Sequence, residues 1–441
     1  MKFTEKAKEK AFDFAANTID ILRMPIMFAV RKAIDARIRK KVKSGEKINV
    51  VFVCHRPAVW ESLHSVYTAM KNDPFFDVKI VAIPNKKDLP GKGYRHNEYF
   101  SEGAEEFWAS YGCINGYNYE TKKWLDLRTL KPDYVFFQQP YNIARPLLYK
   151  SWLVALYAKL AYVPYVLQIV GIDVFESVHP QYFMNSLSFY FCTEKYNFKD
   201  LKKLFKKYNN MNFTKIAAAG FTRFDEYLKK EIDDCKLWQH KGKDRKFRIT
   251  WTPRWCTNEG TCTFFEYKDN IIKYANENDD VEIVFRPHPQ AFTEWIYTGE
   301  MTYSEQAAFR KECKNCGIII DENGEYIHHF KTTDCFLTDI TSLMGEYMIT
   351  GKPIIYCHKK DYFTTFGKKL AKGCYITQSW NETEKKLDEL KAGNDVLSEK
   401  RKVIIQENLY QPKNGAGNNI AACIKADAEN KIIIKKKGKK K

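Results

Sequence analysis

This sequence has no apolar run that could cross a membrane, because every window falls short of the roughly 18 uncharged apolar residues that such a helix needs. It has one CxxC, at Cys313 and Cys316, but no second pair or nearby histidine completes a zinc site. No signal peptide precedes its 12 cysteines, so we expect reduced thiols in a cytosol. These absences argue against a transmembrane protein and against a disulfide-stabilised secreted domain.

The common nucleotide-binding and nucleic-acid-binding motifs are absent too. The chain contains no GxxxxGK[ST] loop, no DxD-like acidic pair beside a strand end, and no RNP, KH or helix-turn-helix pattern. We therefore expect no P-loop, no metal site and no cofactor. Nucleic acid is not an expected partner.

Positive charge is abundant and unevenly distributed. The 72 Lys/Arg and 54 Asp/Glu residues give a formal charge of +18, which implies an anionic partner: nucleic acid, an anionic membrane surface or a phosphorylated substrate. Residues 1–44 carry 12 Lys/Arg against 5 Asp/Glu, and residues 431–441 carry 7 lysines and no acid. The excess is therefore concentrated at the two ends.

Residues 1–44 are predicted to form a basic amphipathic helix with a break at Pro25. Such a helix can lie in the headgroup region of an anionic membrane, and the Lys-rich tail 426–441 would add to the attraction. The protein would then be cytoplasmic and peripherally attached to the inner face of the cell membrane. The alternative is that residues 1–44 pack on the first domain as an ordinary surface helix.

Two successive series of strands and helices occupy the middle of the chain. In residues 45–225, apolar runs predict strands at 48–54, 78–84, 134–138, 165–171, 188–192 and 215–219. In residues 246–425, they predict strands at 247–251, 281–285, 317–320, 334–337 and 353–357. Charged residues 226–245 would link the halves. The alternation predicts an α/β protein with two Rossmann-like domains that face a cleft.

Residues 334–357 combine the features of a βαβ unit. A short apolar strand is followed by a polar turn, an amphipathic helix that Gly351 ends, and a second strand. In a parallel sheet this turn lies at the carboxyl edge, where backbone N–H groups and the helix dipole attract phosphate. Thr341 and Ser342 would add hydroxyl donors, and Glu346 could accept the two hydroxyls of a ribose. The alternative is that these residues only cap a helix and that Glu346 lies on a solvated face.

The segment FRPHP, at the end of the strand predicted at 281–285, is a second candidate phosphate site. Two prolines stiffen the turn, so that Arg286 could form a forked contact with phosphate and His288 could donate to phosphate or shuttle a proton. The alternative is a stacked loop histidine beside a solvent-exposed arginine. Because both turns follow strands of the same predicted sheet, we expect them to line one face of it.

Four motifs between residues 219 and 356, in this order and spacing, resemble those of one known family. They are AGFTRFDEY at 219–227, ITWTPRW at 249–255, IVFRPHP at 283–289 and TDITSLMGEYMITGKPIIY at 338–356. The pattern is similar to that of the CDP-glycerol glycerophosphotransferases, the teichoic-acid and capsule polyol-phosphate transferases, with Thr222 where proline is usual. The resemblance is clearest from Gly220 to Tyr356 and reaches the first half only in architecture.

This resemblance implies a GT-B-like fold and a transferase. It would move glycerol phosphate or ribitol phosphate from a CDP-polyol to a hydroxyl of a cell-surface glycan or lipid-linked acceptor, which attacks the β-phosphorus and releases CMP. By this resemblance, Arg286 and His288 would bind the donor phosphates, and Thr341 and Ser342 would contact the diphosphate. Asp339 would order the turn that carries Thr341 and Ser342, and Glu346 would face the ribose. Pro253, Arg254 and Trp255 would shape the nucleotide side of the cleft, and Arg223 would lie at the interdomain corner.

The family's first domain usually carries a Trp-His-Gly whose histidine is assigned as the general base, and this sequence departs from that pattern. The comparable segment, residues 166–173, reads VLQIVGID and contains no histidine. Either the base has moved, with His55, Asp173 and His179 as candidates, or the reaction or acceptor differs. His55 ranks first because it ends the first predicted strand, and the alternative is that it is structural.

Two other functions remain compatible with the sequence. The first is a GT-B glycosyltransferase that uses a nucleotide sugar, because it shares the fold and the binding of phosphate at a helix start. The second is a basic protein without catalysis that binds nucleic acid or a membrane. The donor separates the first alternative from a CDP-polyol transferase, and a salt-titrated oligonucleotide shift would be needed to support the second.

Overall fold

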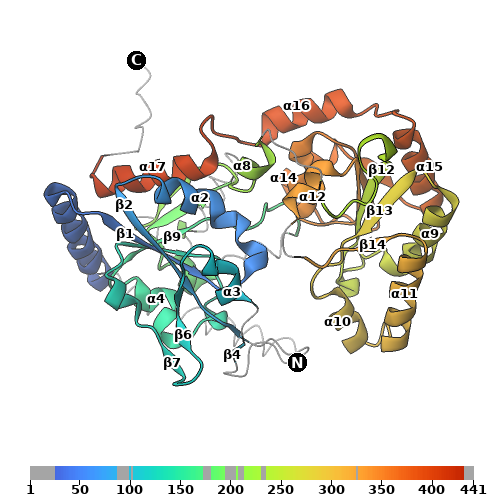
Figure 1. The fold of residues 1–441 in the computed structure, drawn as a ribbon. Helices are drawn as coiled ribbons and strands as arrows, with labels where there is room; N and C mark the ends of the chain where they lie inside the picture. Colours follow the sequence, from blue (N-terminus) through green and yellow to red (C-terminus); the bar gives the residue numbers. More distant parts are fainter. Residues whose placement is uncertain are drawn as a thin grey trace, which may run out of the picture.

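Two parallel β-sheets, one in each half of the chain, organise the protein (Figure 1). The computed structural model describes residues 25–86, 99–100, 103–171, 180–193, 205–206, 213–229, 235–323 and 326–431. Within these residues the first sheet has the strand order β11-β10-β9-β8-β1-β2-β5 and the second has the order β14-β13-β12-β15-β16-β17. All neighbouring pairs within these two sheets are parallel. This is the predicted α/β architecture.

The first sheet alternates its side chains between two cores. Val50 and Phe52 of the first strand enter one apolar cluster, and Val51 and Val53 enter the cluster on the opposite face. Its strands are β1 (Ile48–Cys54), β2 (Phe76–Ala82), β5 (Ile114–Asn115), β8 (Tyr134–Phe137), β9 (Lys159–Tyr162), β10 (Phe189–Cys192) and β11 (Lys215–Ala218). Its helices include α2 (Glu61–Lys71), α3 (Ala104–Ala109), α4 (Ser151–Val154), α6 (Gln181–Met184) and α8 (Phe224–Tyr227).

The second sheet has its own core, rich in aromatic side chains. Its strands are β12 (Phe247–Thr252), β13 (Val281–Phe285), β14 (Ile319–Ile320), β15 (Cys335–Thr338), β16 (Ile354–Cys357) and β17 (Tyr375–Thr377). Its helices are α9 (Phe264–Glu277), α10 (Ala291–Tyr297), α11 (Tyr303–Asn315), α12 (Ile327–Thr332), α13 (Leu343–Tyr347), α14 (Thr365–Ala371), α15 (Trp380–Lys391) and α16 (Ser398–Asn408). The βαβ unit predicted at residues 334–357 is present as β15, α13 and β16, and Gly351 ends its helical segment with a φ of 72°.

One predicted strand of the first half is wrong. Residues 165–171 are outside the first sheet, whose strand in this region is β9 at Lys159–Tyr162. Instead, Val170 forms an isolated antiparallel bridge with Phe363 of the second half, and the Thr364 N–H donates to the Ile169 carbonyl at 3.0 Å. The segment therefore connects the two domains. A Cβ on Gly367 would lie 2.1 Å from the Ile169 carbonyl oxygen, so only glycine permits this approach.

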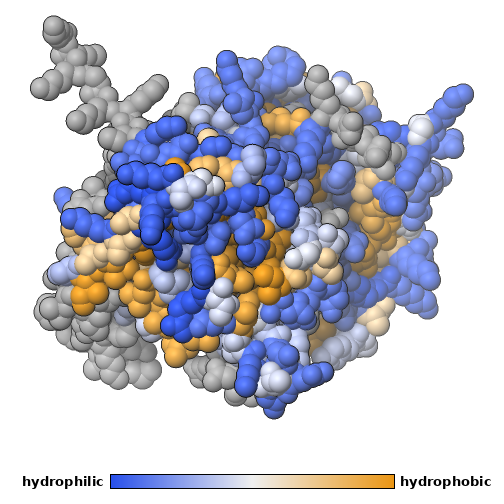
Figure 2. All heavy atoms as spheres, turned by 60° about the vertical axis from the view of Figure 1, so that its left-hand side comes forward, coloured by the Kyte–Doolittle hydropathy of each residue, from blue (hydrophilic) through white to orange (hydrophobic). Residues whose placement is uncertain are grey.

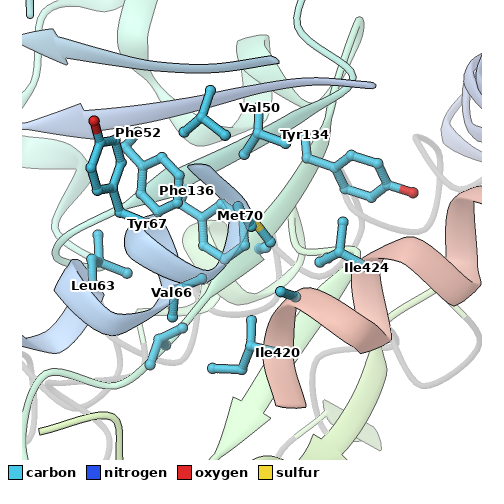
Figure 3. Close-up of a cluster of buried hydrophobic side chains, with 14 of the residues drawn as sticks. Val50, Phe52, Leu63, Val66, Tyr67, Met70, Tyr134, Phe136, Ile420 and Ile424 are labelled. Carbon is cyan, nitrogen blue, oxygen red and sulfur yellow. The ribbon is translucent and has the colours of Figure 1, made fainter. Parts of the chain in front are cut away.

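The last described helix, α17 (Ala416–Ala428), belongs to the first domain, although the sequence placed residues up to 425 in the second. Ile420 and Ile424 of α17 point toward Met70 of α2 and Phe136 of β8 (Figure 3). The chain thus crosses between the domains twice, through α8 and again before α17 (Figure 1). Met70 and Phe136 lie more than 200 residues earlier in the chain than the helix that covers them.

A buried carboxylate fastens α17 beneath the first sheet. Asp427 accepts hydrogen bonds from the Tyr134 hydroxyl and the Lys159 ammonium, each at 2.6 Å, and also pairs with Lys215. These partners begin β8, β9 and β11, so one side chain holds three strands to one helix. Burial would raise the pKa of Asp427, but the two ammonium groups outweigh burial and lower it.

We expect Asp427→Asn to lower the free energy of unfolding by about 3 kcal/mol, the lower end of the range for breaking a buried ion pair, because Lys215 is largely exposed. The folded pKa lies below the unfolded value. The stabilisation is therefore complete above about pH 4 and is lost as the pH falls through the folded pKa, so the variant should lose less stability on acidification than the wild type. Urea unfolding at neutral and acid pH measures both effects.

Glu429→Gln is the control for this prediction, since Glu429 pairs with the exposed Lys431. It should change the free energy of unfolding by less than about 1 kcal/mol. Equal effects of the two variants would contradict the prediction.

The described part of the N-terminal segment, residues 25–44, is a helix that packs on the first domain. Ile34 and Ile38 are buried in its core, Arg31 donates to the Phe213 and Leu187 carbonyls, and Lys41 pairs with Asp133 at 2.6 Å. These contacts are those of the surface-helix alternative. Residues 1–24 and the tail 432–441 lie outside the described residues. Within the described part of the chain, every helix is too short or too polar to cross a bilayer.

Candidate active site between the two sheets

A cleft of about 650 Å³ lies where the carboxyl ends of the two sheets face each other. Its first-domain wall includes Arg56, which follows β1, and Gln139, which follows β8. Its second-domain wall is built from the segments after β12, β13 and β15. Parallel α/β sheets place ligands at these strand ends, because the backbone there is open to solvent and the following helices point their amino ends inward. We refer to this site as the cleft.

The cleft brings together nine of the side chains that the sequence singled out. They are Arg223, Pro253, Arg254, Trp255, Arg286, His288, Thr341, Ser342 and Glu346. The FRPHP corner and the turn before α13, which the sequence predicted on one face of the sheet, therefore line one space. Two further candidates, His55 and Asp339, are buried behind its walls.

Arg286 is held in the cleft wall by three groups. Its guanidinium pairs with the Asp321 carboxylate, donates to the Asn323 carbonyl at 2.6 Å, and lies 4.9 Å from the centre of the Tyr326 ring. Burial would raise the pKa of Asp321, but the His329 imidazole and Arg286 lower it to about 2. An ionised, buried carboxylate thus holds the guanidinium in place. Anion binding would therefore cost this side chain little further conformational entropy.

His288 presents a donor to the cleft. Its Nδ1 accepts a hydrogen bond from the Gln290 N–H at 3.2 Å, so that the neutral ring carries its proton on Nε2. The ring stacks on Trp255 at 5.2 Å between centroids. His288 is exposed toward the cleft, yet the surrounding protein desolvates the ring, and this desolvation together with Arg254 and Arg56 lowers its pKa. The residue is therefore suited to donate a hydrogen bond to an anion.

Asp339 orders the cleft wall from behind. Its carboxylate accepts from the Arg254 N–H at 2.9 Å, from the Thr263 N–H at 2.7 Å and from the Thr263 hydroxyl. Burial raises the pKa of Asp339 to about 7, although these hydrogen bonds oppose the rise. The aspartate thus ties the end of β15 to the turn after β12. Arg254 is fixed by a two-point contact with Glu259, at 2.8 and 2.7 Å.

A buried ion pair forms the interdomain corner of the cleft. Arg223 donates to both carboxylate oxygens of Glu346, at 2.9 and 3.1 Å, and the Tyr326 hydroxyl donates to Glu346 at 2.6 Å. Burial would lower the pKa of Arg223, but Glu346 and Tyr326 outweigh it and raise the pKa. Glu346 was expected to accept ribose hydroxyls. It lines the cleft, but its carboxylate is already engaged by two protein donors.

The turn before α13 leaves its polar groups at the cleft. Thr341 and Ser342 are both half-buried, and the Thr341 hydroxyl accepts from the Leu343 N–H at 3.4 Å. Ser342 occupies the N-cap position but makes no side-chain capping bond. Gly345 keeps the short helix against the first domain, because a Cβ there would meet Leu167 at 3.1 Å. The start of this helix is thus held close to the first-domain wall.

The structure places His55, the first-ranked candidate for the general base, behind the cleft wall. Its side chain is only 2% exposed, and its Nε2 lies 3.0 Å from the Gln139 Oε1. Burial and the nearby guanidinium groups of Arg145 and Arg56 lower the pKa of His55 to about 3, so the ring is a poor proton acceptor. His55 instead supports Gln139, which does line the cleft. Its alternative candidates, Asp173 and His179, lie outside the described residues.

Several residues of the cleft were not predicted. Arg56 follows His55 at the end of β1, and its backbone N–H donates to the Gln138 side chain at 3.0 Å, which aims the turn at the cleft. Tyr141 and Tyr165 share a hydrogen bond of 3.0 Å on the same wall. Arg56 could have been found from its place after a strand. The tyrosines carry no comparable signal, because aromatic residues are frequent throughout this chain.

Comparisons with known proteins find one matching family. Residues 196–400, which include every second-domain residue of the cleft named above, match the family described as CDP-glycerol:poly(glycerophosphate) glycerophosphotransferase. No curated protein sequence matches the chain.

Solved structures share the two-domain arrangement. The wall teichoic acid polymerase TagF is 15% identical, with a TM-score of 0.50 over 96% of this chain and 99% of that one. A TagF variant soaked with CDPG is 14% identical, with a TM-score of 0.51 over 96% and 98%. A UDP-GlcNAc 2-epimerase from Neisseria meningitidis, bound to UDP-GlcNAc, is 13% identical, with a TM-score of 0.54 over 88% and 100%. These likenesses show a GT-B-like fold.

Proposed function

We propose that this chain, of which residues 196–400 match the CDP-glycerol glycerophosphotransferase family, transfers a polyol phosphate from a CDP-polyol to an acceptor hydroxyl within the cleft. The polyol would be glycerol or ribitol, the acceptor a cell-surface glycan or a lipid-linked oligosaccharide, and the leaving group CMP. The observation that carries the proposal is the convergence of Arg286, His288, Thr341 and Ser342 on one space. Such a cluster of donors suits a diphosphate, because it is preorganised for negative charge.

In the proposed reaction the acceptor oxygen attacks the β-phosphorus while the bond to the bridging oxygen of CMP breaks. Phosphoryl transfer depends mainly on positioning and on stabilisation of charge on the phosphate oxygens. Arg286 and the Nε2–H of His288 would stabilise that charge on one side, and the turn at Thr341 and Ser342 on the other. His288 would act as a donor and not as the proton acceptor, because its Nδ1 already accepts from Gln290.

The base that removes the hydroxyl proton would come from the first-domain side. Among the described residues that line this wall there is no histidine and no carboxylate. Asp173 and His179 remain the candidates. Both follow Gly171, whose N–H donates to the Tyr362 carbonyl of the second domain at 2.7 Å. Substitution of each in turn, with kcat measured against pH, would identify the base as the residue whose loss removes the acid limb of the profile.

The choice of nucleotide donor substrate tests the proposed function directly. Purified protein should release CMP from CDP-glycerol or CDP-ribitol when a lipid-linked or oligosaccharide acceptor is present. The same preparation should not turn over UDP- or GDP-sugars. Turnover only with nucleotide sugars would contradict the proposal and would support the glycosyltransferase alternative.

We also propose that the protein works at the inner face of the cell membrane, in teichoic-acid or capsule biosynthesis. Support comes from the charge at both ends of the chain and from Ile26 and Phe28, which are 61% and 51% exposed at the start of the first described helix. This helix lies at the left of Figure 1, and Figure 2 turns that side forward, where hydrophilic residues border hydrophobic ones. Such a surface suits an anionic headgroup region.

Removal of residues 1–24 and 432–441 should shift the protein from anionic vesicles to the supernatant in a sedimentation assay. Activity on a short soluble acceptor should persist, because residues 25–44, which carry the buried Ile34 and Ile38, are kept. A control that removes only residues 432–441 tests how much of the vesicle binding depends on the lysine tail. Unchanged sedimentation of the double truncation would contradict membrane attachment through the ends.

A further inference from the structure

Three metal-ligating side chains meet outside the cleft. Glu61 and His64 lie one turn apart on α2, and Glu226 lies on α8. The Nδ1 of His64 is 3.2 Å from Oε1 of Glu226 and 4.0 Å from Oε2 of Glu61. All three ligand atoms lie within 4.8 Å of one another. None of the three residues lines the cleft, so the proposed transfer reaction leaves them without a role.

Their spacing suits a small divalent ion. Zinc bonds to nitrogen and oxygen are about 2.0–2.2 Å long, which places the ligands of a tetrahedral site roughly 3.4 Å apart. The observed separations surround this value, and small side-chain rotations would reach it. Residues at i and i+3 share one face of a helix, so Glu61 and His64 approach the ion from the same side. One imidazole and two carboxylates are donors that zinc accepts, with a fourth position for water.

The surroundings allow an ion to enter and compensate its charge. The side chains of Glu61, His64 and Glu226 are 20%, 26% and 16% exposed, so the site is sheltered but reachable. Lys229 pairs with Glu226 at 2.6 Å, but through Oε2, which leaves Oε1 directed at His64. Lys229 is itself 60% exposed. The carboxylates of Glu61 and Glu226 would together balance the two positive charges of a divalent cation.

We propose that Glu61, His64 and Glu226 form a zinc-type divalent metal site that fastens α8 to α2. The Thr222 hydroxyl already donates to the Ser62 carbonyl at 2.7 Å across the same contact. The next residue, Arg223, forms the corner of the cleft. The bound ion would therefore hold the first crossing between the domains in place. This site does not depend on the proposed transfer reaction, because its ligands belong to the contact between α2 and α8.

The test uses the full-length protein, without an affinity tag, after removal of metal with EDTA. Titration with ZnCl2 should show one saturable site per chain, and Zn²⁺ should raise Tm, since binding only to the folded state stabilises it. His64→Ala and Glu226→Gln should each weaken Zn²⁺ binding at least tenfold and remove the rise in Tm. Glu61→Gln provides a third variant if either of these fails to fold. Co²⁺ in place of Zn²⁺ should give a visible absorption band that His64→Ala abolishes.

The matched control is His358→Ala. His358 lies 3.3 Å from Asp361 at i and i+3, as in the proposed site, but no third ligand joins this pair among the described residues. This variant should bind Zn²⁺ like the wild type. No saturable binding by the wild type, or binding that is unchanged in His64→Ala and Glu226→Gln, would overturn the proposal.

Discussion

Replacement of His288 by alanine should lower the kcat of CMP release by about 10²–10³-fold, the usual effect of removing one preorganised donor to developing negative charge. The ring stacks on Trp255 and is exposed toward the cleft, so the change should leave Tm nearly unaffected. Rates should be measured with saturating CDP-glycerol and a fixed acceptor, which separates kcat from KM.

His288→Gln is the informative companion to the alanine variant. Glutamine keeps an N–H donor of similar reach but cannot act as a base at neutral pH. If His288 donates to the phosphate, the kcat of His288→Gln should be at least tenfold higher than that of His288→Ala. Equal inactivity of the two variants would instead indicate that His288 moves a proton. The lowered pKa of His288 predicts further that the pH profile of kcat/KM has no limb from this residue near neutrality.

The second large effect concerns the buried pair of Arg223 and Glu346. Arg223→Met should lower the free energy of unfolding by about 3–5 kcal/mol, because Glu346 is fully buried and would lose its only described cationic partner. The same variant should lower kcat/KM at least tenfold, since Arg223 lines the cleft. Urea unfolding and CMP release measure the two losses separately.

A double variant separates the roles of this pair. Arg223→Met with Glu346→Leu replaces both charges by apolar groups, which usually restores most of the stability lost when one partner is removed. We expect recovered stability without recovered activity. Wild-type rates in the double variant would show that the pair only supports the fold. Wild-type stability of Arg223→Met alone would contradict the burial described here.

The strands that run through the middle of each sheet could be predicted because their sequence is locally apolar. β1 and β13 match the predicted bounds for this reason. β9 could not be predicted, since it begins with Lys159, whose charge is compensated by Asp427 from the far end of the chain. Residues 165–171 have the composition of a strand but are drawn to the second domain by backbone pairing with residues 362–364.

The site could be predicted where a strand end carries its own signal. Arg286 and His288 stand in a proline-braced turn, and Thr341 and Ser342 precede a helix, so their positions follow from short-range patterns. His55 also follows a strand, but whether such a side chain enters the cleft or turns behind it depends on Gln139, a residue of another strand end. The proposed metal site was missed for the same reason, because Glu226 joins Glu61 and His64 only in the fold.

A crystal structure of the protein with CDP-glycerol tests the central claim most directly, which is that one cleft binds the donor diphosphate between two turns of the second domain. The diphosphate should lie within hydrogen-bonding distance of Arg286 and His288 on one side and of the turn at Thr341 and Ser342 on the other. A diphosphate bound elsewhere, or one that contacts only one of the two turns, would contradict this account.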